Sequence, residues 1–254
     1  MAAVPAVYNS NIDLMYGISG YPLLQTFSPD YFNTKFERLG LQECYHKLPL
    51  AAIGELEDVL RTYPELKGLN VTIPYKEAVI PFLHELHDTA REIGAVNTIR
   101  ITNGKLKGYN TDVIGFRDSL QPLLQPQHKQ ALILGTGGAA KAVAYALTQL
   151  NISYRFVSRI PAAGALSYAM LGPDTIAEYL LIINTTPLGM TPDINSAPAI
   201  PYQYLTSSHL LYDLIYSPAE TLFLLKGKES GATIKNGYDM LIGQAEAAWK
   251  IWNE

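Results

Sequence analysis

Lys76 stands where ordinary helix chemistry disfavours a positive charge. Residues 68–72 form a strand-like run, and Pro74 suits the first turn of a helix expected from residue 75 to residue 93. The unpaired N–H groups of a helix start carry a partial positive charge, which costs a cation about 0.3–1 kcal/mol and favours the neutral amine. The position therefore suits a lysine that exchanges a proton. An isolated lysine is more often a solvated surface residue, so this interpretation depends on the other motifs of the chain.

Polar motifs follow Lys76 in a definite order. They are AVNT at 95–98, GYNTD at 108–112, NTTPLGM at 184–190 and GYDML at 237–241, the last followed by Gln244. With a glycine-rich loop between the second and the third, the set closely resembles the shikimate dehydrogenase family from about residue 16 to about residue 249. The resemblance implies an oxidoreductase that reversibly reduces 3-dehydroshikimate to shikimate with NADPH, on the route to chorismate and the aromatic amino acids.

The resemblance assigns the catalytic roles to Lys76 and Asp112. The nicotinamide would deliver a hydride to the C3 carbonyl carbon while Lys76 gives a proton to the developing alkoxide. Asp112 would hold the C4 hydroxyl and Lys76 in register. The local sequence alone equally allows Asp112 to cap the helix expected over residues 113–124.

Two hydroxyls are implied to hold the substrate's carboxylate, those of Thr26 and Ser28. Relatives commonly have histidine where Gln25 stands, and Thr26 adds a methyl group to the family's serine. Ser28 is also typical of a helix N-cap, and a capped helix start is itself an anion site. The complete substrate set implied by the resemblance is Thr26, Ser28, Asn70, Thr72, Lys76, Asn97, Asp112, Tyr216 and Gln244. Asn97 and Asn110 could instead satisfy the backbone of turns.

A glycine-rich loop predicts the cofactor site. A buried-strand run at residues 132–134 leads into a G-x-G-x-x-A match that begins at Gly135. Gly135 permits the tight turn, Gly137 lets backbone approach a pyrophosphate, and Ala140 allows close packing of the following helix. Glycine turns after strands often only save space, but the strand before and the helix after favour a dinucleotide. The loop residues predicted to bind it are Gly135, Thr136, Gly137, Gly138 and Ala139.

Arg159 predicts which dinucleotide binds. The next strand ends in Ser158 and Arg159 with no acid for a ribose 2′-hydroxyl, whereas a guanidinium can bind a 2′-phosphate, so NADP(H) is favoured over NAD. The family usually has Asn-Arg-Thr or Asn-Arg-Ser here, so Ser158 and Ile160 are departures. The resemblance adds further cofactor residues, which are Asn184, Thr186, Gly189, Leu214 and Gly237.

Strands and helices alternate along the chain, which predicts an α/β fold with two domains. Strands are expected at 14–19, 44–48, 68–72, 96–102, 130–134, 154–158, 180–184, 210–214 and 233–235, and the other helices at 28–39 and 51–61. Residues 1–111 with 238–254 are predicted to form a largely parallel substrate-binding domain, and 112–237 a Rossmann-like NADP-binding domain. The resemblance implies that the last helix, 238–252, packs back on the first domain. The stretch 160–173 is unusually brief, so a helix of longer relatives is expected to be reduced there.

Composition excludes several other classes of protein. A net charge of −4 argues against a nucleic-acid partner, and no run approaches the ~20 apolar residues of a membrane span. The single cysteine, Cys44, excludes an internal disulfide and fits a cytoplasmic protein in which it is a small core residue. His84 and His87 share one face of the expected helix without a third ligand, so no metal is expected. Residues 1–13 lack the features of a signal peptide.

The sequence leaves some alternatives open. A small-molecule substrate is the expected partner, and the protein is expected to be a monomer or a homodimer. A quinate/shikimate dehydrogenase with relaxed substrate or nucleotide preference shares nearly all these motifs. A non-catalytic protein that binds a metabolite or dinucleotide is compatible with the changes at Gln25 and Thr26, although the presence of Lys76 and Asp112 opposes it.

Overall fold

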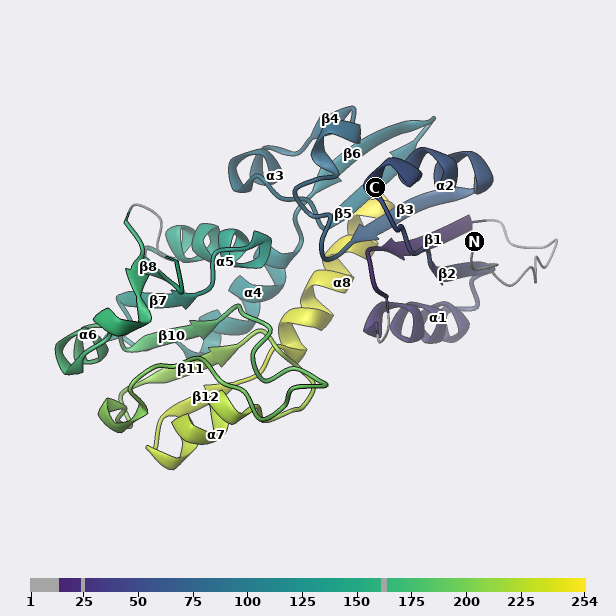
Figure 1. Ribbon diagram of the computed structural model, residues 1–254. Coiled ribbons are helices and arrows are strands. Elements are labelled where there is room, and N and C mark those ends of the chain that lie inside the picture. The colour runs from purple at the N-terminus through teal and green to yellow at the C-terminus, as the bar shows by residue number, and fades with distance from the viewer. Residues whose placement is uncertain (1–13, 24–25, 161–163) are drawn as a thin grey trace. The chain divides into compact units, whose positions relative to one another are not determined.

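The computed structural model describes residues 14–23, 26–160 and 164–254, so Gln25 and the predictions for residues 1–13 lie outside the described part. The chain forms two compact units (Figure 1). The first contains the residues up to Asn110 together with Ala248–Glu254, and the second is Thr111–Ala247. The sequence placed the whole last helix with the first domain, whereas residues 238–247 lie in the second unit.

The first unit is built on a six-stranded mixed sheet in the order β2-β1-β3-β5-β6-β4. β1, β2 and β3 are parallel, β5 runs antiparallel to β3 and β6, and β4 is parallel to β6. The sequence predicted neither β4 nor β6, and the sheet is therefore less parallel than expected. In chain order the elements are β1 (Leu14–Ser19), α1 (Phe27–Leu39), β2 (Glu43–Lys47), η1 (Ile53–Glu55), α2 (Leu56–Thr62), β3 (Leu66–Val71), η2 (Ile80–Phe82), β4 (Glu85–Leu86), α3 (Asp88–Ile93), β5 (Thr98–Thr102) and β6 (Lys105–Tyr109).

The expected helix over residues 75–93 is wrong. Turns occupy residues 76–79, followed by η2, β4 and α3. The backbone explains the difference, because the Lys76 carbonyl accepts a hydrogen bond from the Val96 N–H at 2.7 Å and Pro81 has no N–H to continue a helix. Lys76 thus lies in a turn, and the argument that a helix start favours its neutral amine no longer applies.

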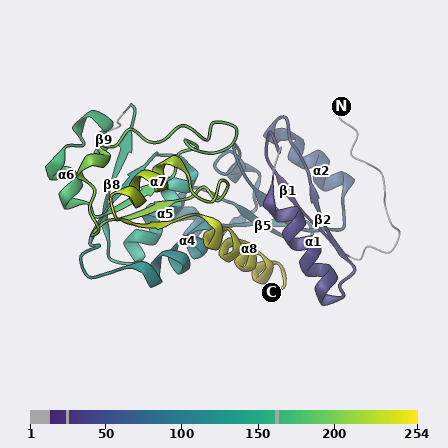
Figure 2. The ribbon, with the colours of Figure 1, turned by 90° about the horizontal axis from the view of Figure 1, so that it is seen from below.

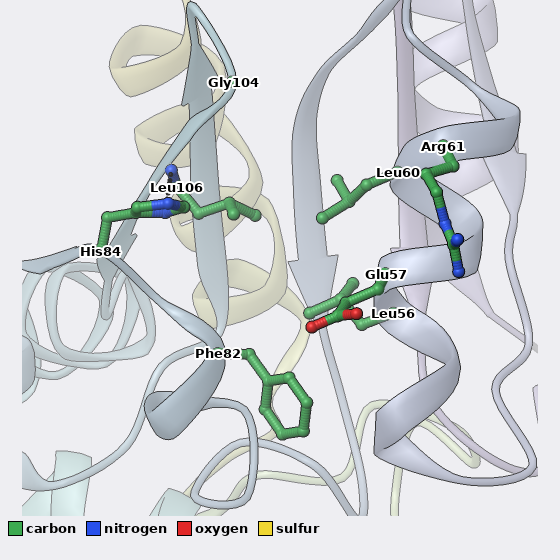
Figure 3. Close-up of a pocket in the computed structure, with 8 residues that line it drawn as sticks. All are labelled: Leu56, Glu57, Leu60, Arg61, Phe82, His84, Gly104 and Leu106. Atoms are coloured by element: carbon green, nitrogen blue, oxygen red, sulfur yellow. Dashed lines mark hydrogen bonds between the residues drawn. The ribbon is translucent and has the colours of Figure 1, made fainter.

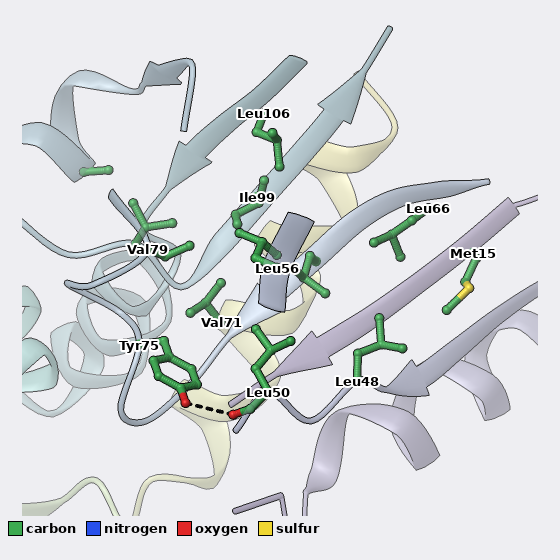
Figure 4. Packing of buried hydrophobic residues seen from close by; sticks show 13 residues of the cluster. Met15, Leu48, Leu50, Leu56, Leu66, Val71, Tyr75, Val79, Ile99 and Leu106 are labelled. Carbon is green, nitrogen blue, oxygen red and sulfur yellow. Dashed lines mark hydrogen bonds between the residues drawn. The ribbon is translucent and has the colours of Figure 1, made fainter. Parts of the chain in front are cut away.

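Apolar side chains on one face of this sheet explain why the turn is held in place. Tyr75 and Val79 are buried in a cluster with Leu56, Leu69 and Ile99 (Figure 4). The Tyr75 hydroxyl donates a hydrogen bond to the Leu50 carbonyl at 2.8 Å. Burial of these two side chains anchors the segment on either side of Lys76.

The second unit has an all-parallel, Rossmann-like sheet in the order β12-β11-β10-β7-β8-β9. Helix α7 packs on β11 and β12 (Figure 1), and α4 packs on α5 (Figure 2). In chain order the elements are α4 (Asp112–Leu120), η3 (Gln121–Leu123), β7 (Gln130–Leu134), α5 (Gly138–Gln149), β8 (Ser153–Ser158), β9 (Leu166–Ser167), η4 (Tyr168–Met170), α6 (Pro173–Glu178), β10 (Leu181–Asn184), η5 (Tyr202–Tyr204), β11 (Leu210–Asp213), α7 (Leu222–Glu229), β12 (Thr233–Lys235) and α8 (Tyr238–Trp252). The short edge strand β9 was not predicted.

The C-terminal end of α8 packs into the first unit, which confirms the expected return of the last helix. The Trp252 indole N–H donates to the Ile99 carbonyl at 3.0 Å, and the ring stacks on Tyr16 with 4.9 Å between centroids. Gly68 lies so close to the indole that an added Cβ would be 2.4 Å from its nitrogen. Glycine is thus required at position 68 for the tryptophan to lie against β3.

Candidate substrate and cofactor sites

The carboxyl ends of parallel strands gather the predicted substrate residues of the first unit. The Thr72 N–H, just after β3, donates to the Ser19 carbonyl at the end of β1 at 2.9 Å. The Val71 N–H donates to the Asn97 carbonyl at 2.8 Å. Asn70, Thr72 and Asn97 therefore share the edge of the sheet at which α/β proteins bind ligands.

Asn70 is the centre of a buried hydrogen-bond network at this edge. Its Oδ1 accepts from the Tyr45 hydroxyl at 2.7 Å, and its Nδ2 donates to the Asn97 carbonyl at 3.2 Å and to Thr98 Oγ1 at 3.1 Å. Thr98 in turn donates to Asn97 Oδ1 at 3.1 Å. Burial raises the pKa of Tyr45 well above its usual value, although a side-chain hydrogen bond with Ser28 opposes the shift. The network holds Ser28, Asn70 and Asn97 in fixed positions.

The two hydroxyls predicted to hold a carboxylate differ in their surroundings. Ser28 lies inside the first turn of α1, where Thr26 occupies the cap position, so the N-cap interpretation of Ser28 is wrong. Thr26 makes no side-chain cap hydrogen bond, and its Oγ1 is buried without a partner. Buried polar atoms are nearly always hydrogen-bonded. An unpartnered hydroxyl beside Ser28 fits a site that takes a ligand oxygen.

Lys76 is joined to the same edge through its backbone. Its carbonyl bonds to Val96, the residue before Asn97, and the Asn97 N–H donates to the Tyr109 carbonyl at 3.1 Å. The Asn110 side chain donates a hydrogen bond from Nδ2 to the Ala95 carbonyl at 3.0 Å, so it satisfies a backbone group, as the alternative interpretation of this residue expected.

Asp112 belongs to the second unit, where it is buried as the first residue of α4. Thr111 occupies the cap position, so Asp112 is not the N-cap.

The glycine loop of the second unit has the geometry that a pyrophosphate needs. Gly135 has φ +110°, a conformation that favours glycine, and an added Cβ would lie 2.7 Å from Thr185 Oγ1. At Gly137 an added Cβ would meet no atom within 4 Å, so open space faces the backbone there. Helix α5 begins at Gly138 with no side-chain cap, and Ala140 is fully buried behind the loop. The uncapped N–H groups suit a phosphate anion, so the residues present fit a dinucleotide.

Arg159 follows the strand next to this loop. β8 pairs with β7 so that Val157 lies opposite Leu134, and the Gly135 N–H donates to the Val157 carbonyl at 2.9 Å. The Arg159 side chain is exposed, two residues beyond that contact. Burial raises the pKa of Tyr168, while the charge of Arg159 opposes that shift. Arg159 thus has the position in the fold at which a residue that binds a nucleotide 2′-phosphate is expected.

The remaining predicted cofactor residues surround the ends of β10 and β11. The Leu214 N–H donates to the Asn184 carbonyl at 3.0 Å. Asn184 Oδ1 accepts from the Thr186 N–H at 3.0 Å and from its hydroxyl at 2.7 Å. Gly189 has φ +97°, and at Gly237 an added Cβ would lie 2.0 Å from the Leu214 carbonyl oxygen. The hydrogen bonds between Asn184 and Thr186 stabilise a compact turn over residues 184–189, next to the glycine loop.

Two further site residues of the second unit have different surroundings. Tyr216 is half-buried, and burial raises its pKa. Gln244 lies in α8 and donates its Nε2 to the Leu241 carbonyl at 3.0 Å. Close packing of Gly115 against Gly243 holds this part of α8 against α4, because an added Cβ on Gly243 would be 3.0 Å from Gly115 Cα.

A pocket of about 350 Å³ in the first unit contains none of the predicted site residues (Figure 3). Its lining residues are Leu56, Glu57, Leu60, Arg61, Phe82, His84, Gly104 and Leu106. His84 and His87 do not share a helix face as expected. His84 Nδ1 accepts from the Leu106 N–H at 3.1 Å, and His87 Nδ1 accepts from the Thr89 N–H at 3.3 Å. Both imidazole rings thus accept hydrogen bonds from backbone N–H groups.

The described residues contain neither a metal-binding cluster nor a helix able to cross a membrane. No group of three or more His, Cys, Asp or Glu side chains in residues 14–23, 26–160 and 164–254 is arranged to hold a metal ion. Within the same ranges, no helix combines the length and the apolar character needed to cross a membrane. Cys44 is only partly buried, in β2, and burial raises its pKa to about 11.

The chain is similar to known proteins over nearly its full length. A family model described as the shikimate dehydrogenase substrate binding domain matches residues 18–99. A shikimate dehydrogenase (NADP(+)) of Carboxydothermus hydrogenoformans is 43% identical over 253 residues, which cover 93% of this chain and 90% of the relative. The chain belongs to the shikimate dehydrogenase family. The matched segment of the family model contains Thr26, Asn70 and Lys76.

Solved structures extend the similarity to the whole fold of this family. A shikimate dehydrogenase from Aquifex aeolicus is 35% identical with a TM-score of 0.84, and the match covers 94% of this chain and 92% of that one. A shikimate 5-dehydrogenase from Thermus thermophilus in complex with NADP(H) and shikimate is 31% identical with a TM-score of 0.83, covering 94% and 93%. Both matches cover nearly the full chain, so the similarity extends over both units.

Two residues with central positions were not predicted from the sequence. Tyr45 connects Ser28 to Asn70, and its only signal was a buried position in a strand. Asp213 is fully buried at the end of β11 and bonds to Asn184. An acid at the carboxyl end of a buried strand is a signal that could have identified it.

Proposed function

We propose that this chain interconverts 3-dehydroshikimate and shikimate with NADP(H), using the carboxyl edge of the first sheet for the substrate and the glycine loop of the second for the cofactor. Family membership over nearly the full chain supports the reaction. The observation that carries the substrate side is the buried network around Asn70. It presents amide and hydroxyl groups that suit a small polyol carboxylate.

Each substrate residue has a proposed role that follows from its chemistry. Thr26 and Ser28 bind the carboxylate, for which the unpartnered Thr26 hydroxyl is available. Asn70, Thr72 and Asn97 orient the ring hydroxyls, and Tyr216 and Gln244 are further proposed substrate residues. Asp112 binds the C4 hydroxyl. Directional bonds from several groups fix the C3 carbonyl for reaction.

Lys76 is the proposed acid in the direction of reduction. An ammonium N–H gives its proton to the C3 oxygen as negative charge develops there, and in the reverse direction the neutral amine takes the hydroxyl proton. Such assistance typically contributes about 10²–10⁴ in rate. NADPH, when bound, supplies the hydride to the C3 carbon. The turn that holds Lys76 is anchored by buried Tyr75 and Val79, so the amine is carried by a supported segment.

The cofactor residues divide by the part of the dinucleotide that they bind. The loop from Gly135 to Ala139 and the start of α5 would hold the pyrophosphate. Ser158 and Arg159 would hold the 2′-phosphate, which favours NADP over NAD. Asn184, Thr186, Gly189, Leu214 and Gly237 would form the wall beside the nicotinamide.

A direct assay tests this proposal. Purified protein is expected to reduce NADP with shikimate, followed as absorbance of the reduced nicotinamide, and to use quinate or NAD much less well. Lys76→Met, which keeps the aliphatic stem, should lower kcat by about 10²–10⁴ and change shikimate binding less. Lys67→Met, a lysine of β3 in the same unit, is the matched control and should keep wild-type kcat.

The possible results separate the alternatives. Efficient use of quinate or NAD would favour the relaxed dehydrogenase. Absence of turnover by a folded protein that still binds NADPH would favour the non-catalytic binder. Near-normal kcat in Lys76→Met would refute the proton-transfer role while leaving the overall reaction intact.

A further inference from the structure

Asp213 is an acid at the edge of the second sheet to which no role has yet been assigned. It is the last residue of β11, in register with Asn184 of β10, and Asn184 is in register with Leu134 of β7. The ends of these three strands thus lie side by side, and the glycine loop follows Leu134 directly. Asp213 and Asn184 have no exposed surface.

The carboxylate is surrounded by donors. Asp213 Oδ1 accepts from Asn184 Nδ2 and from the Ile215 N–H, both at 3.0 Å, and Oδ2 accepts from Thr221 Oγ1 at 2.6 Å. Three donors aimed at one side chain favour its ionised form. Burial acts in the opposite direction and is the larger effect, so the pKa of Asp213 is raised from 3.8 to about 6. Above about pH 6, Asp213 therefore carries a negative charge in buried surroundings that favour its neutral form.

The bonds of Asp213 reach both ends of the turn at residues 184–189. Because Asn184 Nδ2 faces the carboxylate, Asn184 Oδ1 faces the Thr186 N–H and hydroxyl. The Thr186 hydroxyl then accepts from the Leu188 N–H at 3.3 Å. At the other end, an added Cβ on Gly189 would lie 3.3 Å from Thr221 Cβ. A reversed Asn184 amide would place its carbonyl oxygen against the carboxylate and leave Thr186 without an acceptor.

We propose that Asp213 is a positioning residue for the cofactor, because its negative charge fixes the Asn184 amide and, through Thr186 and Thr221, the shape of the 184–189 turn beside the nicotinamide. The proposal rests on the function proposed above for the place of that turn. Asp213 itself acts through Asn184 and Thr221, which distinguishes it from a catalytic residue. An isolated structural role would not require a charge, since an uncharged side chain is easier to bury.

The surroundings of Asp213 allow a test by pH. Its hydrogen-bond partners on β10, in the segment after β11 and at the start of α7 are uncharged, being Asn184, the Ile215 backbone and Thr221. Among the described residues, Tyr202 of η5 is a titratable group that interacts with this charge, since burial and then Asp213 raise the pKa of Tyr202. Loss of the Asp213 charge below about pH 6 should therefore loosen the turn.

The decisive variant is Asp213→Asn, which keeps an oxygen for Asn184 and Ile215 and can donate to Thr221. The readout is NADPH affinity by fluorescence titration from pH 5 to 8. At pH 8 the variant should bind NADPH about tenfold more weakly, as expected when charge assistance worth ~1.4 kcal/mol is lost. The 2′-phosphate of NADPH also titrates near ~pH 6, so the result is the difference between variant and wild type. That difference should shrink as pH falls to 5.

A matched control separates this effect from general damage. His209 is 2% exposed and precedes the amino end of the same strand, where its Nδ1 accepts from the Thr206 N–H at 3.0 Å. His209→Gln should keep wild-type NADPH affinity. Equal weakening in both variants, or unchanged affinity in Asp213→Asn at pH 8, would overturn the proposal. Wild-type protein that binds NADPH but does not oxidise shikimate would instead refute the proposed reaction.

A second pair of variants decides the matter if Asp213→Asn does not fold. Thr221→Ser keeps the hydroxyl that donates to Asp213, and Thr221→Val removes it. NADPH affinity should stay within about twofold of wild type in the serine variant and fall about fivefold or more in the valine variant, with shikimate KM little changed. Equal affinities in the two variants would contradict the inference.

Discussion

Replacement of Asp213 by asparagine should stabilise the protein at neutral pH while weakening cofactor binding. The carboxyl group has no exposed surface, and its pKa is raised from 3.8 to about 6 by burial, against the opposing effect of three hydrogen bonds. A group that holds its proton more tightly when folded makes the folded state less stable once the proton has left. The asparagine side chain carries no charge to bury.

The size and direction follow from the two pKa values. Well below pH 3.8 the folded and unfolded forms both bind the proton, and the group has no effect on stability. Between 3.8 and about 6 the wild type loses stability as pH rises, and above 6 the full cost remains. A pKa raised from 3.8 to about 6 corresponds to about 3 kcal/mol, of which only a small part is already present at pH 4.

Urea unfolding of the wild type and of Asp213→Asn from pH 4 to 8 measures this difference. Groups shared by the two proteins cancel, so the free energy of unfolding of the variant should gain about 2–3 kcal/mol on the wild type across that range. A difference that stays constant with pH would mean that the pKa of Asp213 is not raised. If the free energy of unfolding of the wild type instead rises relative to that of the variant as pH rises, the three hydrogen-bond donors outweigh burial.

Three further variants test other parts of the structure. Arg159→Ala should lower kcat/KM for NADP relative to NAD by about 10- to 100-fold through loss of charge-assisted bonds, while Arg155→Ala, in the strand that precedes Arg159, leaves the ratio unchanged; equal ratios in the two would refute the 2′-phosphate role. Gly137→Ala should leave the melting temperature within a few degrees, since its Cβ would enter open space, yet weaken NADPH binding measurably by fluorescence; unchanged affinity would place the pyrophosphate elsewhere. Trp252→Phe should lower the free energy of unfolding by about 1–3 kcal/mol because it leaves the Ile99 carbonyl without its donor, and no loss in urea unfolding would show that this bond is dispensable.

The sequence was most informative where hydrophobic periodicity is undisturbed. The strands β1, β7 and β12 and the helix α8 have their predicted bounds. The failure at residues 75–93 has a physical origin, because Tyr75 and Val79 have the spacing of one helix face although they pack in a turn. Long-range contacts, such as the hydrogen bond from the Val96 N–H to the Lys76 carbonyl, determine the conformation of that segment, and a local sequence pattern carries no information about them.

The site shows the same division between local and long-range information. Motifs identified the groups that we propose bind a ligand, such as Asn70, Asn97 and Gly137, because these occur at strand ends and turns with distinctive chemistry. The residues that hold those groups were missed. Tyr45 reaches Asn70 from a strand that is two positions away in the sheet, and Asp213 reaches Asn184 from the next strand.

Strand order explains why the supporting residues escape local analysis and suggests how to find them. β1 lies between β2 and β3, so the Tyr45 hydroxyl reaches Asn70 Oδ1 across the face of an intervening strand. β10 and β11 are direct neighbours, which places the last residues of both strands, Asn184 and Asp213, opposite each other. In a parallel sheet the residues that end neighbouring strands meet at one edge, whatever their separation in sequence. A buried acid that ends such a strand therefore has a neighbouring strand end to act on, which is why Asp213, rather than an acid within a helix, can position a cofactor turn.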